Sequence, residues 1–290
     1  MKIGVGLPFK NPTDSWPRIE QLIRSVEAGP YSSFAVLDRL VYDIFDPIPL
    51  LAAAAAITSR IRVMSAILVG PVRNAGILAK EAATVDAISG GRLTLGIAVG
   101  SRDDDAAVAP SGFHDRGKRF DVQLETMRRI WAGEQIEGAH GLVGPMPVQS
   151  GGPEMLIGGS ADRAVDRVGR FGDGYIMGGR AMEAEWVKGI MARVQESWER
   201  HGRSGRPRYV ATLPAALGPG SEQAVADAIA DYYGGRPAAG AAREARPNPT
   251  SPQIIRDLIG MHEELGTDEI VFRPVLLDPD QIDRLTDVVS

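Results

Sequence analysis

The chain has 290 residues, enough for one large α/β domain or two ordinary ones. Its net charge of −5 provides no basic surface for nucleic acid, and the absence of cysteine excludes disulfides and thiolate chemistry. The longest apolar run, Leu50 to Ile57, is far shorter than a membrane span, and the first residues lack the apolar core of a signal peptide. We therefore expect a soluble, cytoplasmic protein with no nucleic-acid or membrane partner.

Short apolar segments rich in β-branched residues recur along the chain and predict eight strands. Each is followed by a segment in which apolar residues recur at helical spacing, beginning with Ile19, Leu22, Ile23 and Val26. The predicted strands are residues 2–7, 33–37, 61–69, 93–99, 155–157, 175–177, 209–215 and 269–273.

This alternation predicts an α/β fold, a (β/α)8 TIM barrel with insertions, formed by residues 1–290 as a single domain. The alternative is a doubly wound open sheet. A dinucleotide-binding sheet of that kind needs a third glycine after Gly4 and Gly6, where this chain has Phe9. Residues 234–250 are rich in Gly, Ala, Pro and Arg, and we expect them to form a mobile insertion.

Three glycine-containing strand ends suggest where a ligand binds. Ligands of parallel α/β proteins lie beyond the carboxyl ends of the strands, and Gly100, just after the predicted fourth strand, has no Cβ to hold a flat ligand away. Gly158-Gly159-Ser160 follows the fifth strand and opens a helix, whose free amides attract anions, and Gly178-Gly179 follows the next strand. A phosphate site and two ordinary glycine-rich turns both remain open.

No motif predicts a metal centre. The four histidines are scattered and none stands in H-E-x-x-H, and the G-x-S-x-G motif of a nucleophilic serine is absent. The run Asp103-Asp104-Asp105 could hold a cation, but a solvated loop with helix-capping aspartates is the favoured interpretation. We therefore predict no metal.

Five motifs and one tryptophan are spread along the chain: Asp86-x-x-Ser89-Gly90-Gly91-Arg92-Leu93-x-Leu95-Gly96, Val99-Gly100-x-Arg102-Asp103-Asp104, Arg116-Gly117-x-Arg119-x-Asp121, Trp131, Ile157-Gly158-Gly159-Ser160 and Gly172-Asp173-Gly174-Tyr175-Ile176. Together they resemble the bacterial luciferase-like family of flavin-dependent oxidoreductases, strongly over residues 1–180 and more weakly over 205–290. The resemblance implies a TIM barrel that binds FMN or the deazaflavin coenzyme F420 at the strand ends.

The resemblance also implies a set of cofactor-binding residues. The family has a non-prolyl cis peptide at the end of the third strand, which we expect between Ala66 and Ile67, with Ile67 nearest the ring. The residues implied for the ring are Asp38, Ala66, Ile67, Val99 and Gly100. The residues implied for the phosphate are Gly158, Gly159, Ser160, Gly178 and Gly179.

The catalytic residues are not defined by the resemblance, and the candidates are Asp38, Arg39 and Ser101. F420-using relatives often have Asp-His where this chain has Asp38-Arg39, and some carry a proton-donating glutamate where it has Ser101. Arg39 could hold an anionic substrate or the cofactor tail, or it could pair with Asp38.

The implied function is an oxidoreductase that uses either reduced FMN with O2, supplied by a separate reductase, or F420 for hydride transfer, on a small organic substrate. The alternatives are a non-catalytic flavin-binding protein and a non-flavin barrel enzyme acting on a phosphorylated small molecule. Residues 52–56 are all alanine and give the second helix no polar face. Because the family commonly pairs through its second and third helices, we expect a homodimer; burial within the same chain is the alternative.

Overall fold

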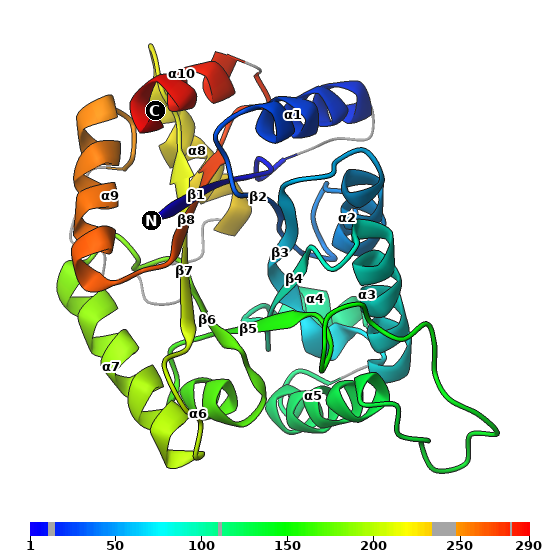
Figure 1. The fold of residues 1–290 in the computed structure, drawn as a ribbon. Helices are drawn as coiled ribbons and strands as arrows, with labels where there is room; N and C mark the ends of the chain where they lie inside the picture. The colour runs from blue at the N-terminus through cyan, green and yellow to red at the C-terminus, as the bar shows by residue number, and fades with distance from the viewer. Residues whose placement is uncertain (11–14, 110–111, 234–247, 279) are drawn as a thin grey trace.

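The computed structural model describes residues 1–10, 15–109, 112–233, 248–278 and 280–290. Eight parallel strands close into one barrel in chain order, so the predicted (β/α)8 TIM barrel is confirmed (Figure 1). The predicted mobile insertion at 234–250 falls mostly on residues 234–247, which lie outside the described part. The strands are β1 Lys2–Gly6, β2 Ser33–Val36, β3 Arg62–Val69, β4 Leu93–Ala98, β5 Glu154–Gly158, β6 Gly174–Met177, β7 Arg208–Ala215 and β8 Glu269–Pro274.

Helices surround the barrel, and the loop between α5 and β5 projects away from the body (Figure 1). None of the helices in the described part of the chain is long and apolar enough to span a bilayer. The helices are α1 Trp16–Ala28, α2 Pro47–Ala56, α3 Ala75–Ser89, α4 Asp103–Val108, α5 Arg116–Trp131, α6 Asp162–Phe171, α7 Ala184–Arg200, α8 Ser221–Tyr233, α9 Pro252–Leu265 and α10 Asp280–Val289, with a 3₁₀ turn, η2, at Gly70–Val72.

Local sequence sets the ends of α3, which separates β3 from β4. Its first turn is capped by Asn74, whose side-chain oxygen accepts the Ile77 amide at 3.1 Å. The helix ends at Gly90, whose φ of 65° lies in the left-handed region that glycine enters without steric cost. The chain then turns directly into β4, as the sequence predicts.

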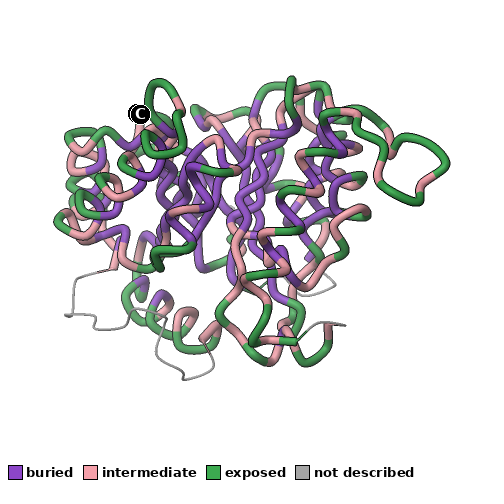
Figure 2. Tube along the Cα trace, turned by 90° about the horizontal axis from the view of Figure 1, so that it is seen from below, coloured by how far each residue is buried: buried purple, intermediate pink, exposed green. Residues whose placement is uncertain are grey.

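Alternate residues of each strand point into the barrel, and the middle of the interior is apolar. Figure 2 shows buried residues concentrated along the central strands and exposed ones on the outer helices. The middle cluster is closely packed, as in other TIM barrels. It contains Ala35, Met64, Ala66, Leu156, Ile176, Val210 and Val271.

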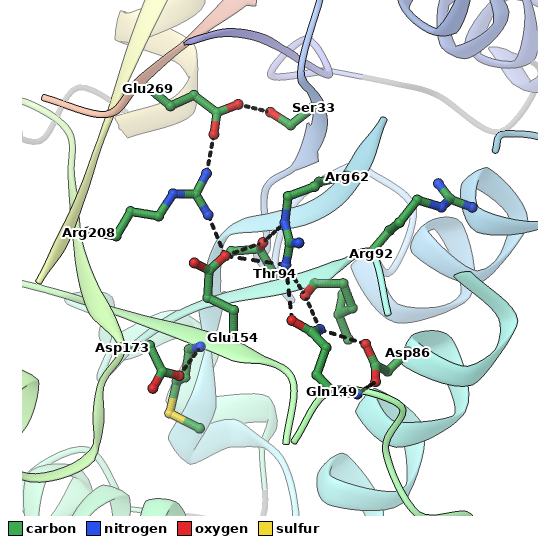
Figure 3. A network of polar contacts seen from close by, with 12 residues as sticks. Ser33, Arg62, Asp86, Arg92, Thr94, Gln149, Glu154, Asp173, Arg208 and Glu269 are labelled. Carbon is green, nitrogen blue, oxygen red and sulfur yellow. Dashed lines mark hydrogen bonds and ion pairs between the residues drawn. The ribbon is translucent and has the colours of Figure 1, made fainter. Parts of the chain in front are cut away.

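Below this cluster, at the amino ends of the strands, the interior is ionic (Figure 3). Arg208 bridges Glu154 and Glu269, and Glu269 also accepts the Ser33 hydroxyl at 2.5 Å. Arg62 donates to the Thr94 hydroxyl at 2.7 Å. Since these groups satisfy one another, this end of the barrel is built for stability.

Candidate functional site

A cavity of about 250 Å³ opens at the carboxyl ends of the strands. At the inward positions above the apolar cluster, Ala98 and Gly178 carry almost no side chain and line the cavity, while Gly6 and Gly158 leave room for the side chains of Arg273 and Ile67. A TIM barrel normally fills this level with branched side chains. The space is shaped instead by the ends of β2, β3, β4, β6, β7 and β8 and by the last turns of α8.

Eight of the predicted site residues line this cavity, and the Ala66–Ile67 peptide bond is cis, as predicted. They come from segments far apart in the sequence and are Asp38, Arg39, Ala66, Ile67, Gly100, Ser101, Gly178 and Gly179. Val99 does not line it, because its partly buried side chain packs against the hydrophobic core outside the barrel.

The remaining predicted phosphate residues do not line the cavity. Gly158 is buried beneath Ile67, and a Cβ built on Gly158 would lie 2.8 Å from Ile67 Cδ1. Gly159 and Ser160 are exposed just before α6, where the Ser160 carbonyl accepts Arg193 at 3.1 Å. Gly178 and Gly179 therefore line the cavity, whereas Gly159 and Ser160 lie on the turn after the neighbouring strand β5.

Asp38 lies at the end of β2 with its carboxylate already engaged. It accepts the Val69 amide at 2.9 Å and pairs with Arg73 at 3.1 Å, and its side chain is only 2% exposed. Burial raises the pKa of Asp38, and the positive charge of Arg73 opposes this rise. The contacts join the ends of β2 and β3 and so position the cavity wall.

Arg39 pairs with Asp104 at 3.4 Å and not with Asp38. Its guanidinium also donates to the carbonyls of Tyr232 at 2.5 Å and Val41 at 2.8 Å. These contacts tie the loop after β2 to α4 and α8. Arg39 therefore links the segments of the cavity rim through one carboxylate and two main-chain carbonyls.

The predicted solvated aspartate loop is instead the first turn of α4. Arg102 hydrogen-bonds to Asp104 and holds the pKa of that carboxyl below its usual value. Asp105 is buried and accepts the amides of Leu40 at 3.0 Å and Val41 at 2.9 Å. Within the described ranges no three acidic or histidine side chains gather to hold a metal ion.

Comparison with known proteins assigns the family. A model described as luciferase-like monooxygenase matches residues 1–270. The chain belongs to this family. An uncharacterized protein of Mycobacterium tuberculosis is 28% identical over 211 residues, which cover 63% of this chain and 72% of that one. The FMNH2-dependent dimethylsulfone monooxygenase of Pseudomonas putida is 31% identical over 155 residues, 50% of this chain and 41% of that enzyme.

Solved structures share the fold of this chain over nearly its whole length. Monooxygenase RslO1 from Streptomyces bottropensis superposes with a TM-score of 0.81 at 20% identity, over 99% of this chain and 97% of that one. An F420-dependent secondary alcohol dehydrogenase superposes with a TM-score of 0.77 at 14% identity, over 99% and 98% of the two chains. At these identities the likeness shows the fold alone.

Several cavity residues of this luciferase-like chain were missed from the sequence. Tyr232 and Tyr233 end α8 and close one side of the cavity, and burial raises the pKa of Tyr232 to about 12. Arg273 rises from β8, and Phe9 follows β1. The tyrosines gave no local signal, but Arg273 is a charged residue at an inward position of a strand that is buried throughout, and such a residue is an unusual signal in a sequence.

Proposed function

We propose that this protein is an oxidoreductase that binds FMN or coenzyme F420 in the strand-end cavity and acts there on a small organic substrate. The observation that carries the proposal is the hollow upper level of the barrel, lined by the Ala66–Ile67 strand end and by Gly100. Membership of the luciferase-like monooxygenase family supports it. So do relatives whose names include FMNH2 or F420.

The residues present fit a flat redox cofactor. Gly100 has a φ of 72°, and a Cβ there would lie 2.6 Å from Val69 Cγ1. Only glycine fits this position, so no side chain covers the backbone here. Ile67 occupies the space that Gly158 leaves open. In the proposed complex, Ile67 supports one face of the ring and Gly100 faces it across the cavity.

The phosphate is proposed to bind at the glycine-rich turns after β5 and β6. Gly178 and Gly179 line the cavity, and Gly159 and Ser160 precede α6, whose amino end favours negative charge. The Ser160 hydroxyl and the free amides of this turn are the groups assigned to the phosphate.

When bound, the cofactor supplies the redox chemistry, as hydride transfer for F420 or as reaction of reduced FMN with O2. The protein's own residues orient the reactants and exclude water. Asp38 fixes the ends of β2 and β3, and Arg39 fixes the rim against α8. Ser101 is exposed at this rim and is the candidate to hold a proton on a hydroxyl next to the substrate.

Titration of the purified protein with FMN, reduced FMN and F420, followed by absorbance and fluorescence, tests the proposal and selects the cofactor. Ile67→Asp should weaken binding of that cofactor at least tenfold, because it puts a charge against an apolar ring face. Ile88→Asp is the matched control, since Ile88 is 49% exposed on α3. Failure of all three titrations sinks the proposal, and binding without turnover of any substrate favours a storage protein.

We also propose a homodimer, supported by apolar groups left exposed on α2, α3 and α5. Ala56 is exposed at the end of α2, and Ile77 on α3 and Val122 on α5 are 60% and 64% exposed. Such groups gain by association. Light scattering at micromolar concentration should give twice the chain mass, and a monomer contradicts the proposal.

If FMN is the cofactor, a separate reductase is the proposed source of its reduced form.

A further inference from the structure

In the part of the chain that the structure describes, one positive charge inside the cavity, Arg273, has no carboxylate partner. Arg273 stands at the inward position of β8 above Val271, and the residue is only 6% exposed. A Cβ built on Gly6 would lie 3.3 Å from Arg273 Cβ, so the glycine makes room for the long side chain. Its Nη2 donates to the Ala66 carbonyl at 2.7 Å, and its buried Nε has no hydrogen-bond partner among the described residues.

The other arginines around the cavity differ from Arg273 because each pairs with a carboxylate. Arg39 and Arg102 share Asp104. The two further pairs are Arg73 with Asp38 and Arg180 with Glu183. Within the described ranges no carboxylate oxygen lies within 4.0 Å of the Arg273 guanidinium.

The carboxylates that line the cavity are also committed elsewhere. Asp38 is held by Arg73 and the Val69 amide, and Asp105 by two main-chain amides. Neither can turn toward Arg273 without leaving buried donors unpaired. The floor of the cavity therefore carries a fixed positive charge.

A buried guanidinium remains protonated and is costly to leave unpaired. Its planar fork matches the two oxygens of a carboxylate or sulfonate. Contact with the Phe9 ring, whose centroid is 5.4 Å from Arg273 Cζ, compensates the charge only in part. An anionic group on a bound molecule would complete the site.

We propose that Arg273 is the anion-binding residue of this cavity. Resting on the proposed function, this assigns the anion either to a carboxylate or sulfonate of the substrate or to the negative charge that reduction places on the cofactor ring. The shared chemistry is a small delocalised anion above the guanidinium.

The first arm of the test measures anion binding without cofactor. Replacing chloride by formate at constant ionic strength should raise the melting temperature of wild type by about 2 °C or more, while formamide, similar in size but neutral, should not. Arg273→Met should abolish the formate effect and Arg273→Lys should keep part of it. Arg206→Met is the matched control, because Arg206 pairs with Asp268 at the surface.

The second arm compares affinities for oxidised and reduced FMN. Both forms carry the same phosphate, so the ratio of the two affinities reports the difference in charge on the ring. If the ring supplies the anion, Arg273→Met should lower the preference for reduced FMN at least tenfold, and loading with reduced FMN should abolish the formate effect. If the substrate supplies it, the ratio should stay unchanged and the formate effect should persist in the loaded protein.

The proposal is overturned if Arg273→Met matches wild type both in the formate effect and in the ratio of affinities. This differs from failure of the proposed function, in which wild type binds neither FMN nor F420. The formate arm remains decisive in that case, because it needs no cofactor.

Discussion

Glu269→Gln should destabilise the barrel without changing cofactor binding. The Glu269 side chain is 1% exposed, accepts the hydroxyls of Ser32 at 2.6 Å and Ser33 at 2.5 Å, and pairs with Arg208. Removing one partner of a buried ion pair costs about 3–5 kcal/mol. Because Arg208 keeps Glu154, we expect the lower value, about 3 kcal/mol.

Urea unfolding followed by circular dichroism measures this loss in the free energy of unfolding. At about 2 °C per kcal/mol for a chain of this length, the melting temperature should fall by about 6 °C. Glu263→Gln is the control, since Glu263 pairs with the terminal amine at 3.2 Å but is 53% exposed, and it should cost less than about 1 kcal/mol. A loss below about 1 kcal/mol in Glu269→Gln, or a tenfold change in cofactor affinity, would refute the reasoning.

Three further outcomes are expected. Gly158→Val should displace Ile67, since even a Cβ would lie 2.8 Å from it, and weaken FMN or F420 binding about tenfold in a fluorescence titration. Ser160→Asp should weaken cofactor binding by charge repulsion, and an unchanged dissociation constant contradicts the phosphate assignment. Burial lowers the pKa of His262, so the unfolded chain binds a proton at this residue more tightly than the folded chain does. The free energy of unfolding should therefore fall as the pH drops below about 6.5. Urea titrations at several pH values should show a smaller fall for His262→Gln.

The fold could be predicted because its signals are local and repeated. Apolar strands and helical periodicity placed all eight strands, with ends that differ from the structure by a residue or so, as at Leu7 and Val99. The position of the cavity followed from topology, because the carboxyl ends of parallel strands meet at one face. The cis peptide at Ala66 came from family resemblance and not from any local rule.

Pairings of charged residues could not be predicted in the same way. Asp38 is bound by Arg73, which lies on the turn after β3, and Arg39 is bound by Asp104 on α4. The partners lie at no regular interval in the sequence, and the pair of Asp38 with Arg39, one of the alternatives that adjacency in the chain suggested, does not form. Only the closed barrel decides which loop ends meet.

Strand β8 places a stabilising residue and the proposed anion-binding residue on the same inward face. Its inward residues lie at three levels of the barrel. Glu269 belongs to the ionic cluster at the amino ends of the strands, Val271 to the apolar middle cluster, and Arg273 to the cavity. Glu269 is satisfied by Arg208 and neighbouring hydroxyls, whereas among the described residues Arg273 has only the neutral Ala66 carbonyl as hydrogen-bond acceptor. Both are buried charges on one strand, so burial alone does not identify a functional group. What distinguishes Arg273 is that its compensating charge is missing from the described chain, which is expected where a ligand supplies it.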